Sequence, residues 1–446
     1  MTYRIGINCE PQKHALHEWE REYAVRLGSL IAMGLVVSRG IFVFGQDPSQ
    51  GHGAPTPLFD AVAEAENNNT QVAAADHAWR ASAHVAQLVT AMADLESTQR
   101  SAGPGGPKAI ANFNYNRVTD RDVNGTQKQS YFGDLRPWSE VARREAETQK
   151  AQIDIYRSSI ADQVKTIYLR LAYLYQMYDL DDRGAADFAA LIQTELSKYS
   201  LGQGSQAEVL QAQLERTKLL RETTLQHEEV GGLQATLKAL LHRPPDSPDI
   251  IPESIAVTPL KRAADELLQK AASQSPTLNA DSKMIEAQGA QLDVVRADTN
   301  SDFSFGYTFP QGGESYRDGY VLSFNVRLPR GKYLDSQIAA ATEKLDSAHA
   351  QASEDRLRQL AEVQKQYVVV TSSDELMREC KEGLIPQSKA VYQSKLAGYQ
   401  SDREKFSAVI EAFLDELTFE DDYLQALLEH ETALAHLETL TGEKLR

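Results

Sequence analysis

Asp302-Phe303-Ser304-Phe305-Gly306-Tyr307 (DFSFGY) opens the second of two similar patterns in this chain of 446 residues. In that copy, aromatic residues alternate with small or polar ones. A second alternating stretch and a very long helical run follow. The first copy begins with Asn112-Phe113-Asn114-Tyr115, and the two copies lie about 195 residues apart. Because duplication at this scale determines architecture, we predict two similar halves rather than a single-site enzyme.

The duplication also sets the predicted domain boundaries. The first repeat covers 57–242 and the second 259–446, joined by a linker at 243–258 that begins with three closely spaced prolines. Each repeat is expected to hold two strands and two long helices, preceded by a shorter helical region. The strands are predicted at about 110–136 and 301–329, and the long helices at about 138–200, 205–241, 333–397 and 402–441. The shorter helical regions are predicted at about 59–100 and 259–297.

The N-terminal 45 residues are interpreted as a targeting segment. An apolar run from Leu27 to Phe44 follows Arg26 and ends at Gly45, a pattern that predicts signal-peptide cleavage before Gln46. A membrane anchor is the alternative, but 18 residues interrupted by Arg39 suit it poorly. Four glutamates before the run make a poor signal n-region, which leaves the translation start open. Residues 46–56 are predicted to be a flexible leader.

The strand candidates alternate with a period of two. Phe303, Phe305 and Tyr307 are expected on one face, and Ser304 and Gly306 on the other. Short strands that are aromatic on one face and polar on the other are typical of a transmembrane β-barrel wall. Two hairpins of a soluble antiparallel sheet fit these stretches equally well.

The long helical runs favour the first alternative. Ser139 to Tyr199 predicts a helix of roughly 90 Å, and Leu334 to Leu396 predicts a similar one. The first run carries an apolar stripe of Ile153, Ile160, Val164, Ile167, Leu171 and Leu174, and a charged face of Glu140, Arg143, Arg144, Glu147 and Lys150. Such helices imply coiled-coil packing, with antiparallel hairpins turning at Gly202 and Gly398. Four strands cannot close a barrel alone, whereas three chains would supply twelve.

Several short motifs, in order and in duplicate, resemble the TolC-type outer membrane efflux proteins over nearly the whole range 57–442. They are Pro57-Leu58, Leu201-Gly202, Glu208-Val209-Leu210-Gln211-Ala212, Pro259-Leu260, Pro276-Thr277-Leu278, Asp302-Phe303-Ser304, Leu328-Pro329 and Leu437-Glu438-Thr439-Leu440-Thr441-Gly442. The second strand pair, with Lys332 after it, looks most like the heavy-metal-cation efflux branch. Members of that branch often carry a lipid-anchored Cys after the cleavage site, where this chain has Gln46.

The resemblance implies a mainly α-helical fold with a β-barrel part. A homotrimer would form a 12-stranded barrel in the outer membrane of a Gram-negative bacterium and an α-helical tunnel in the periplasm. The channel would dock an inner membrane pump through a periplasmic adaptor and conduct solutes without a cofactor or chemistry of its own. Polar strand faces would then line the lumen, and aromatic faces would meet lipid.

The resemblance also indicates a pore constriction just past each helical turn. Relatives commonly carry an acidic residue six positions after the turn glycine, which gives Glu208 after Gly202 and Glu404 after Gly398. Six carboxylates in a trimer would favour cations. The alternative is that both are ordinary solvated residues of a first helical turn. Ser407 and Gln400 stand where relatives often have an aspartate and a gating arginine, so any closing network must differ.

The two helical turns are the expected adaptor contact. The residues proposed for it are Leu201, Gly202, Gly204, Ser205, Gly398, Tyr399 and Ser401. Tyr399 is predicted to be exposed and to anchor this interface, as aromatic residues often do. Any hairpin turn would have a similar composition, so the assignment depends on the resemblance.

Composition argues against other classes of protein. A net charge of −17 with no basic stripe disfavours nucleic-acid binding. No CxxC, HExxH, GxSxG or Walker motif occurs, which argues against a metal site and against an enzyme. His77, His84, His227, His349 and His430, and acidic pairs such as Asp181-Asp182 and Asp421-Asp422, are predicted to be solvated. The rival interpretations are a periplasmic coiled-coil scaffold without a pore and a module that binds a ligand in a soluble β-layer.

Overall fold

The computed structural model describes residues 55–101, 112–115, 123–130, 136–202, 205–297, 302–309, 321–327 and 331–445. The predicted signal segment, with its cleavage site, and nearly all of the predicted leader lie outside these residues. No helix in the described part of the chain combines the length and apolar character that crossing a bilayer requires.

Each half begins with a pair of helices where the sequence predicted one helical region. In the first half these are α1 (Leu58–Asn68) and α2 (Thr70–Ser101), and in the second α5 (Ala264–Gln274) and α6 (Pro276–Ala297). Asn69 separates the first pair because its backbone is extended and its side chain accepts a hydrogen bond from the amide of Gln71 at 2.8 Å. Ser275 and Pro276 separate the second pair, with proline at the first helical position.

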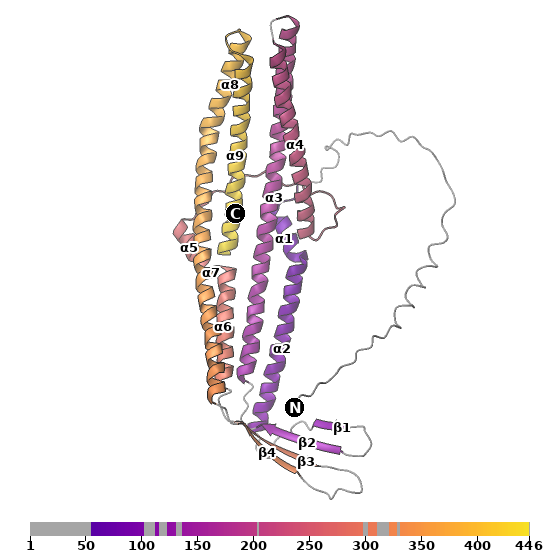
Figure 1. The fold of residues 1–446 in the computed structure, drawn as a ribbon, viewed down its shortest axis with the longest axis vertical. Coiled ribbons are helices and arrows are strands. Elements are labelled where there is room, and N and C mark those ends of the chain that lie inside the picture. Colours follow the sequence, from indigo (N-terminus) through magenta and orange to yellow (C-terminus); the bar gives the residue numbers. More distant parts are fainter. Residues whose placement is uncertain are drawn as a thin grey trace, which may run out of the picture. The chain divides into compact units, whose positions relative to one another are not determined.

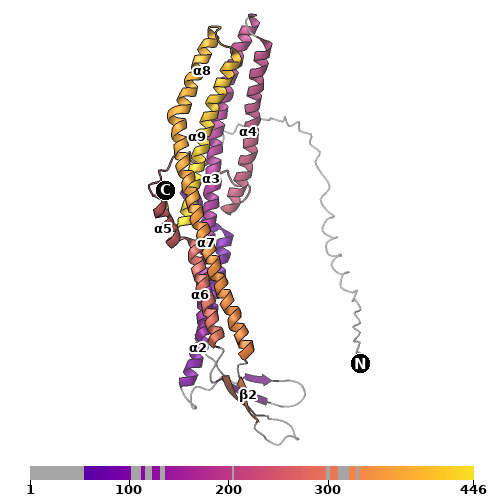
Figure 2. The same ribbon diagram turned by 60° about the vertical axis from the view of Figure 1, so that its left-hand side comes forward.

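The first half then forms a hairpin of α3 (Arg136–Ser200, 65 residues) and α4 (Gln206–Leu240). The predicted apolar stripe of α3 is confirmed, since Ile153, Ile160, Val164, Leu171 and Leu174 are all at most 4% exposed. Ile167 packs half-buried against the same cluster. The α3 helix packs against α1, α2, α4, α6 and α9, so it joins the two halves (Figures 1 and 2).

The second half forms the equivalent hairpin, with one interruption. Helix α7 (Gly331–Glu379) passes through a π-helical turn, η2 (Cys380–Leu384), into α8 (Ile385–Gln400), and α9 (Phe406–Thr441) returns. The π turn ends two residues before Pro386, whose ring would clash with the carbonyl of Glu382 in a regular helix. Ile385 instead donates its amide to the carbonyl of Cys380, which widens the turn.

Four strands form one antiparallel sheet in the order β1-β2-β3-β4. They are β1 (Asn112–Tyr115), β2 (Val123–Ser130), β3 (Asp302–Phe309) and β4 (Val321–Arg327). The halves meet where β2 pairs with β3, with Gln129 opposite Phe305, and Phe305 lies opposite Phe324 of β4. The sheet lies at one end of the long helices, and the two helical turns lie at the other (Figure 1).

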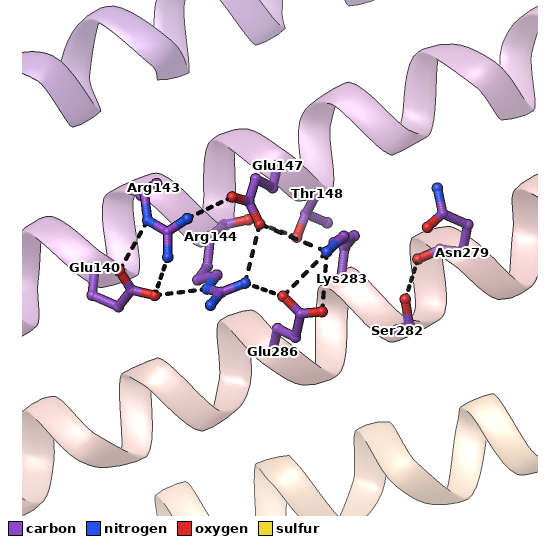
Figure 3. Close-up of polar contacts among 9 residues, drawn as sticks. All are labelled: Glu140, Arg143, Arg144, Glu147, Thr148, Asn279, Ser282, Lys283 and Glu286. Atoms are coloured by element: carbon purple, nitrogen blue, oxygen red, sulfur yellow. Dashed lines mark hydrogen bonds and ion pairs between the residues drawn. The ribbon is translucent and has the colours of Figure 1, made fainter.

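The charged face of α3 near the sheet forms an ion-pair network with α6 (Figure 3). Arg144 contacts Glu140 on its own helix at 2.7 Å and pairs with Glu286 of α6. Lys283 of α6 bonds Glu286 at 3.0 Å and approaches Glu147 at 3.8 Å. These groups are partly exposed, so single pairs contribute little, and the network fixes the α3–α6 register rather than adding much stability.

Candidate functional site

The candidate site is the pair of helical tips, where α3 turns into α4 and α8 turns into α9. At the first tip, Gly202 has a φ of +75°, a conformation that glycine adopts without strain. Ser205 caps α4 by accepting a hydrogen bond from the amide of Ala207 at 3.2 Å. Leu201 is 74% exposed, as a contact surface requires. Gly204 lies outside the described residues.

The second tip has a turn of the same length, since α8 ends at Gln400 and α9 begins at Phe406. The carbonyl of Gly398 accepts a hydrogen bond from the amide of Arg403 at 2.9 Å, and Ser401 Oγ donates to the carbonyl of Ala397 at 3.0 Å. A Cβ atom at position 398 would lie 2.7 Å from Cγ of Glu404, so the turn closes tightly only with glycine. Helix α9 begins at Phe406, four residues after the predicted start.

The prediction that Tyr399 is exposed is wrong. Its side chain is 7% exposed, and its ring packs on Phe406 with centroids 5.2 Å apart. The Nζ atom of Lys198 lies 3.6 Å from the ring centroid and donates to the Tyr399 carbonyl at 3.1 Å. The Tyr399 hydroxyl donates a hydrogen bond to Glu195 of α3. Tyr399 therefore joins the second tip to the first and is not a free anchor for a partner.

Glu195 is the acidic group at the centre of this junction, and no local sequence pattern marked it. Its side chain is completely buried. Burial raises the pKa of Glu195, and the nearby carboxylate of Glu208 raises it further, while Lys198 acts in the opposite direction. Two carboxyl groups thus face each other inside the first tip with a lysine and a tyrosine hydroxyl beside them.

The two predicted pore glutamates do not occupy equivalent positions. Glu208 is half-buried in the first turn of α4, against Glu195. Glu404 is exposed in the turn, two residues before α9 begins. The reason is that Gly202 follows the end of α3, whereas Gly398 lies within the last turn of α8. The residue that shares the positive φ of Gly202 is Asp402, with φ of +55°.

The other two residues predicted at the constriction also lie at the second tip. Gln400 is the last residue of α8 and is exposed. Ser407 is the second residue of α9 and is half-buried. Neither forms a side-chain bond to Glu208 or Glu404 among the contacts of the described residues.

Away from the tips, two groups predicted to be solvated are buried. His430 is 0% exposed, with Nε2 3.3 Å from Asp374 of α7 and Nδ1 3.1 Å from Glu431. Asp181 is 7% exposed and accepts a hydrogen bond from Gln226 at 2.8 Å. Burial raises the pKa of Asp181. Asp374 and Gln226 lie far from His430 and Asp181 in the sequence, so no local pattern marks these contacts.

A part-buried contact involves the other predicted acidic pair. Asp421 of α9 accepts a hydrogen bond from the hydroxyl of Tyr173 at 2.8 Å and so fixes α9 to α3. Within the described residues, no three or more His, Cys, Asp or Glu side chains gather as metal ligands would.

The fold is that of the TolC-family outer membrane channels. No family model and no curated protein sequence matches the chain. Among solved structures, the outer-membrane channel OprN matches with a TM-score of 0.71 at 17% identity, covering 87% of this chain and 91% of that one. The outer membrane protein VceC from Vibrio cholerae matches with a TM-score of 0.68 at 16% identity, covering 87% and 97%.

CusC, whose crystal structures concern the conformational changes that accompany folding and transmembrane channel formation, matches with a TM-score of 0.67 at 13% identity. The match covers 91% of this chain and 96% of CusC. At these identities the likeness establishes the fold. The prediction of a mainly helical fold with long helices is therefore confirmed.

Proposed function

We propose that this chain is the outer membrane channel component of a tripartite efflux or secretion system. The observation that supports it best is the match to channel structures over nearly the full length of both chains, including both helical hairpins. The protein would lie in the outer membrane of a Gram-negative bacterium, with a large periplasmic portion. It would conduct solutes passively and catalyse no reaction.

The functional unit is proposed to be a homotrimer. The described residues of one chain form four strands of an open sheet, and twelve such strands from three chains would close a barrel without free edges. The helical hairpins of three chains would surround the periplasmic tunnel. Several apolar side chains of α4 support assembly because they are exposed in the single chain, namely Leu210, Leu214, Leu220 and Leu225.

The tips are proposed to dock a periplasmic adaptor, which would connect the channel to an inner membrane pump. Leu201, Gly202, Ser205 and Ser401 are exposed there and remain candidates for this contact. Tyr399 and Glu195 instead would hold the two hairpins together, so opening the tunnel mouth requires breaking their bond.

Cation preference is proposed to arise at the same end. Glu404 is exposed in its turn, whereas Glu208 is half-buried beside Glu195. Three exposed Glu404 carboxylates would favour cations at the mouth, as acidic rings do in cation channels. The heavy-metal branch of the family stays a prediction from the second strand pair, since CusC is one of several channels with this fold.

Planar bilayer recordings test the proposal. The purified protein is expected to give small cation-selective currents, and Glu404→Gln is expected to reduce the selectivity more than Glu208→Gln. Unchanged selectivity in both variants would contradict the proposed acidic ring at the mouth but would leave the proposed channel function intact. A folded protein that never inserts, and that salt extracts from membranes, would favour the periplasmic coiled-coil scaffold.

A further inference from the structure

An open cavity of about 720 Å³ lies where α5 ends and α6 begins. Its walls come from the break between these helices, the first turns of α6, residues of α3 and α7, and Gly442 just after α9. Gly442 has a φ of +68°, and a Cβ atom there would lie 2.9 Å from the carbonyl oxygen of Gln274, so the end of α9 closely approaches the break. Small-molecule sites commonly enclose roughly 300–1,000 Å³, so the cavity has room for a ligand.

Ser275, between α5 and α6, lines this cavity and lacks a polar partner. It is 2% exposed, and its Oγ forms no hydrogen bond with any residue that the structure describes. It stands directly before Pro276, where a serine hydroxyl usually accepts a bond from an amide of the helix that follows. Buried hydroxyl groups nearly always have a partner. Ser275 is therefore available to a polar group that enters the cavity.

Asp281, near the start of α6, is a second cavity residue without a partner. It is half-buried, its Oδ2 is shut off from solvent, and its carboxyl forms no hydrogen bond or ion pair with the described residues. Burial raises the pKa of Asp281, and the nearby carboxylate of Asp355 on α7 raises it further. Asp154 of α3, which lines the same cavity, adds negative charge. A charged Asp281 therefore needs a cation that the described part of the chain does not supply.

A basic residue on another wall of the cavity is likewise unpaired. Arg356 of α7 is exposed and forms no ion pair within the described ranges. Arg358, two residues further along α7, instead pairs with Asp355 at 3.1 Å. His349, two turns earlier on α7, lines the same wall and is exposed. Asp281 and Arg356 thus line one cavity with opposite charges that do not neutralise each other.

We propose that this cavity binds a zwitterionic amino-acid group. The ammonium of the ligand pairs with Asp281, its carboxylate pairs with Arg356, and the Ser275 hydroxyl forms a hydrogen bond with the ligand. A ligand of one sign only would leave either the carboxylate or the guanidinium unpaired, whereas a zwitterion satisfies both. Serine and amide side chains make up much of the remaining wall, which suits a polar ligand rather than an apolar one.

The position of the cavity indicates where such a ligand comes from. Helix α5 lies at the edge of the long helices (Figures 1 and 2), and three copies of it inside the proposed tunnel would block the passage. The cavity would therefore open to the periplasm, about 30 Å from the sheet end of α6. Zwitterionic amino-acid groups occur there as free amino acids and as the diaminopimelate of cell-wall stem peptides. This step rests on the proposed function, whereas the binding chemistry does not.

Calorimetric titration of the full-length protein in detergent with meso-diaminopimelate tests the site. Asp281→Asn and Arg356→Gln are each expected to weaken binding by about tenfold or more, since each removes a charge-assisted bond. The matched controls on the same helices are Asp293→Asn and Arg358→Gln, which change exposed residues outside the cavity and are expected to bind like the wild type. Pimelate lacks the ammonium groups and 1,5-diaminopentane lacks the carboxylates, so both should bind more weakly than diaminopimelate.

The outcomes separate this inference from the proposed function. No binding by the wild type, or equal binding by the wild type and both cavity variants, overturns the site. Asp281→Asn removes an unfavourable charge, so its melting temperature should not fall, and weaker binding then reflects the site rather than unfolding. A protein that binds diaminopimelate but forms no pore in planar bilayers overturns the proposed channel alone.

Cosedimentation with purified cell-wall sacculi distinguishes the two sources of the ligand. A trimer would carry three cavities, so it is expected to bind the repeating polymer more tightly than the free amino acid. The wild type should sediment with sacculi, and either free diaminopimelate or Asp281→Asn should prevent this. Calorimetric binding without cosedimentation would overturn the cell-wall source and assign the site to free amino acids.

Discussion

Replacing Tyr399 by phenylalanine removes one oxygen atom from the junction between the two tips. In the wild type that hydroxyl donates a hydrogen bond to the buried carboxyl of Glu195. The substitution leaves the ring contact with Phe406 unchanged. A hydrogen bond to a charged buried group contributes about 1.5–3 kcal/mol, and ~1.4 kcal/mol corresponds to a tenfold change in an equilibrium constant. The equilibrium between joined and separated tips is therefore expected to shift by roughly ten- to 150-fold while Glu195 is charged, and by less when Glu195 is protonated.

Single-channel recording measures this shift as open probability. Tyr399→Phe is expected to raise it, because the closed tips lose a bond that the open tips lack. Tyr199→Phe is the matched control, since Tyr199 occupies the same position in the first half but is 46% exposed. If both variants behave like the wild type, or if both open equally, Tyr399 does not act through Glu195.

The same junction carries a pH dependence of defined sign. Because the pKa of Glu195 is raised in the folded tip, the tip binds more protons when folded than when separated and solvated. Its stabilising effect is fully present below the ordinary value of 4.5 and is lost as the pH rises through the raised pKa. Open probability is expected to increase with pH in the wild type and to lose this dependence in Glu195→Gln. A dependence of the opposite sign contradicts the assignment.

Three further substitutions test the helical body. Asp162 raises the pKa of His436 through a 2.7 Å bond, so the stability lost in His436→Gln should be greatest below pH 6.5 and vanish above the raised pKa in denaturant titrations. Leu171→Ala should lower the free energy of unfolding by about 2–5 kcal/mol, because Leu171 is 0% exposed; a smaller loss would mean that the site collapses around the cavity. Gly398→Ala should loosen the second tip in hydrogen exchange, whereas Gly383→Ala, with no atom within 4 Å of its Cβ position, should not.

The sequence predicted the long helices and the buried stripe of α3 because both follow from a local period. The stripe repeats along one helix face, and every member lies in or against the core. It also predicted hairpin turns at the correct ends of these helices. The breaks between α1 and α2 and between α5 and α6 were missed, although Asn69 and Pro276 are typical residues for such breaks.

The tip residues were harder to predict because their partners come from the other half of the chain. Tyr399 and its acceptor Glu195 are 204 positions apart, so composition around Tyr399 indicated only an aromatic residue in a turn. His430 was misjudged for the same reason, since Asp374 lies on a different helix. Local patterns predict which elements form. The burial of a single polar side chain depends on which elements meet.

Gly202 and Gly398 do not occupy equivalent positions in the two halves, so counting six residues from each glycine paired two glutamates that are not equivalent. The interval between the halves explains this difference. The helices begin 195 residues apart, at Arg136 and Gly331, but end 200 apart, at Ser200 and Gln400. Five extra residues in a regular α-helix would rotate the following face by about 140°, since each residue turns by about 100°. The π turn at Cys380–Leu384 has a wider ring, so its five residues complete little more than one turn. Side chains of α8 consequently point in nearly the same direction as those of α3. Between η2 and the tips, equivalent residues of the two halves therefore differ by 200 in number, whereas between η2 and the sheet they do not.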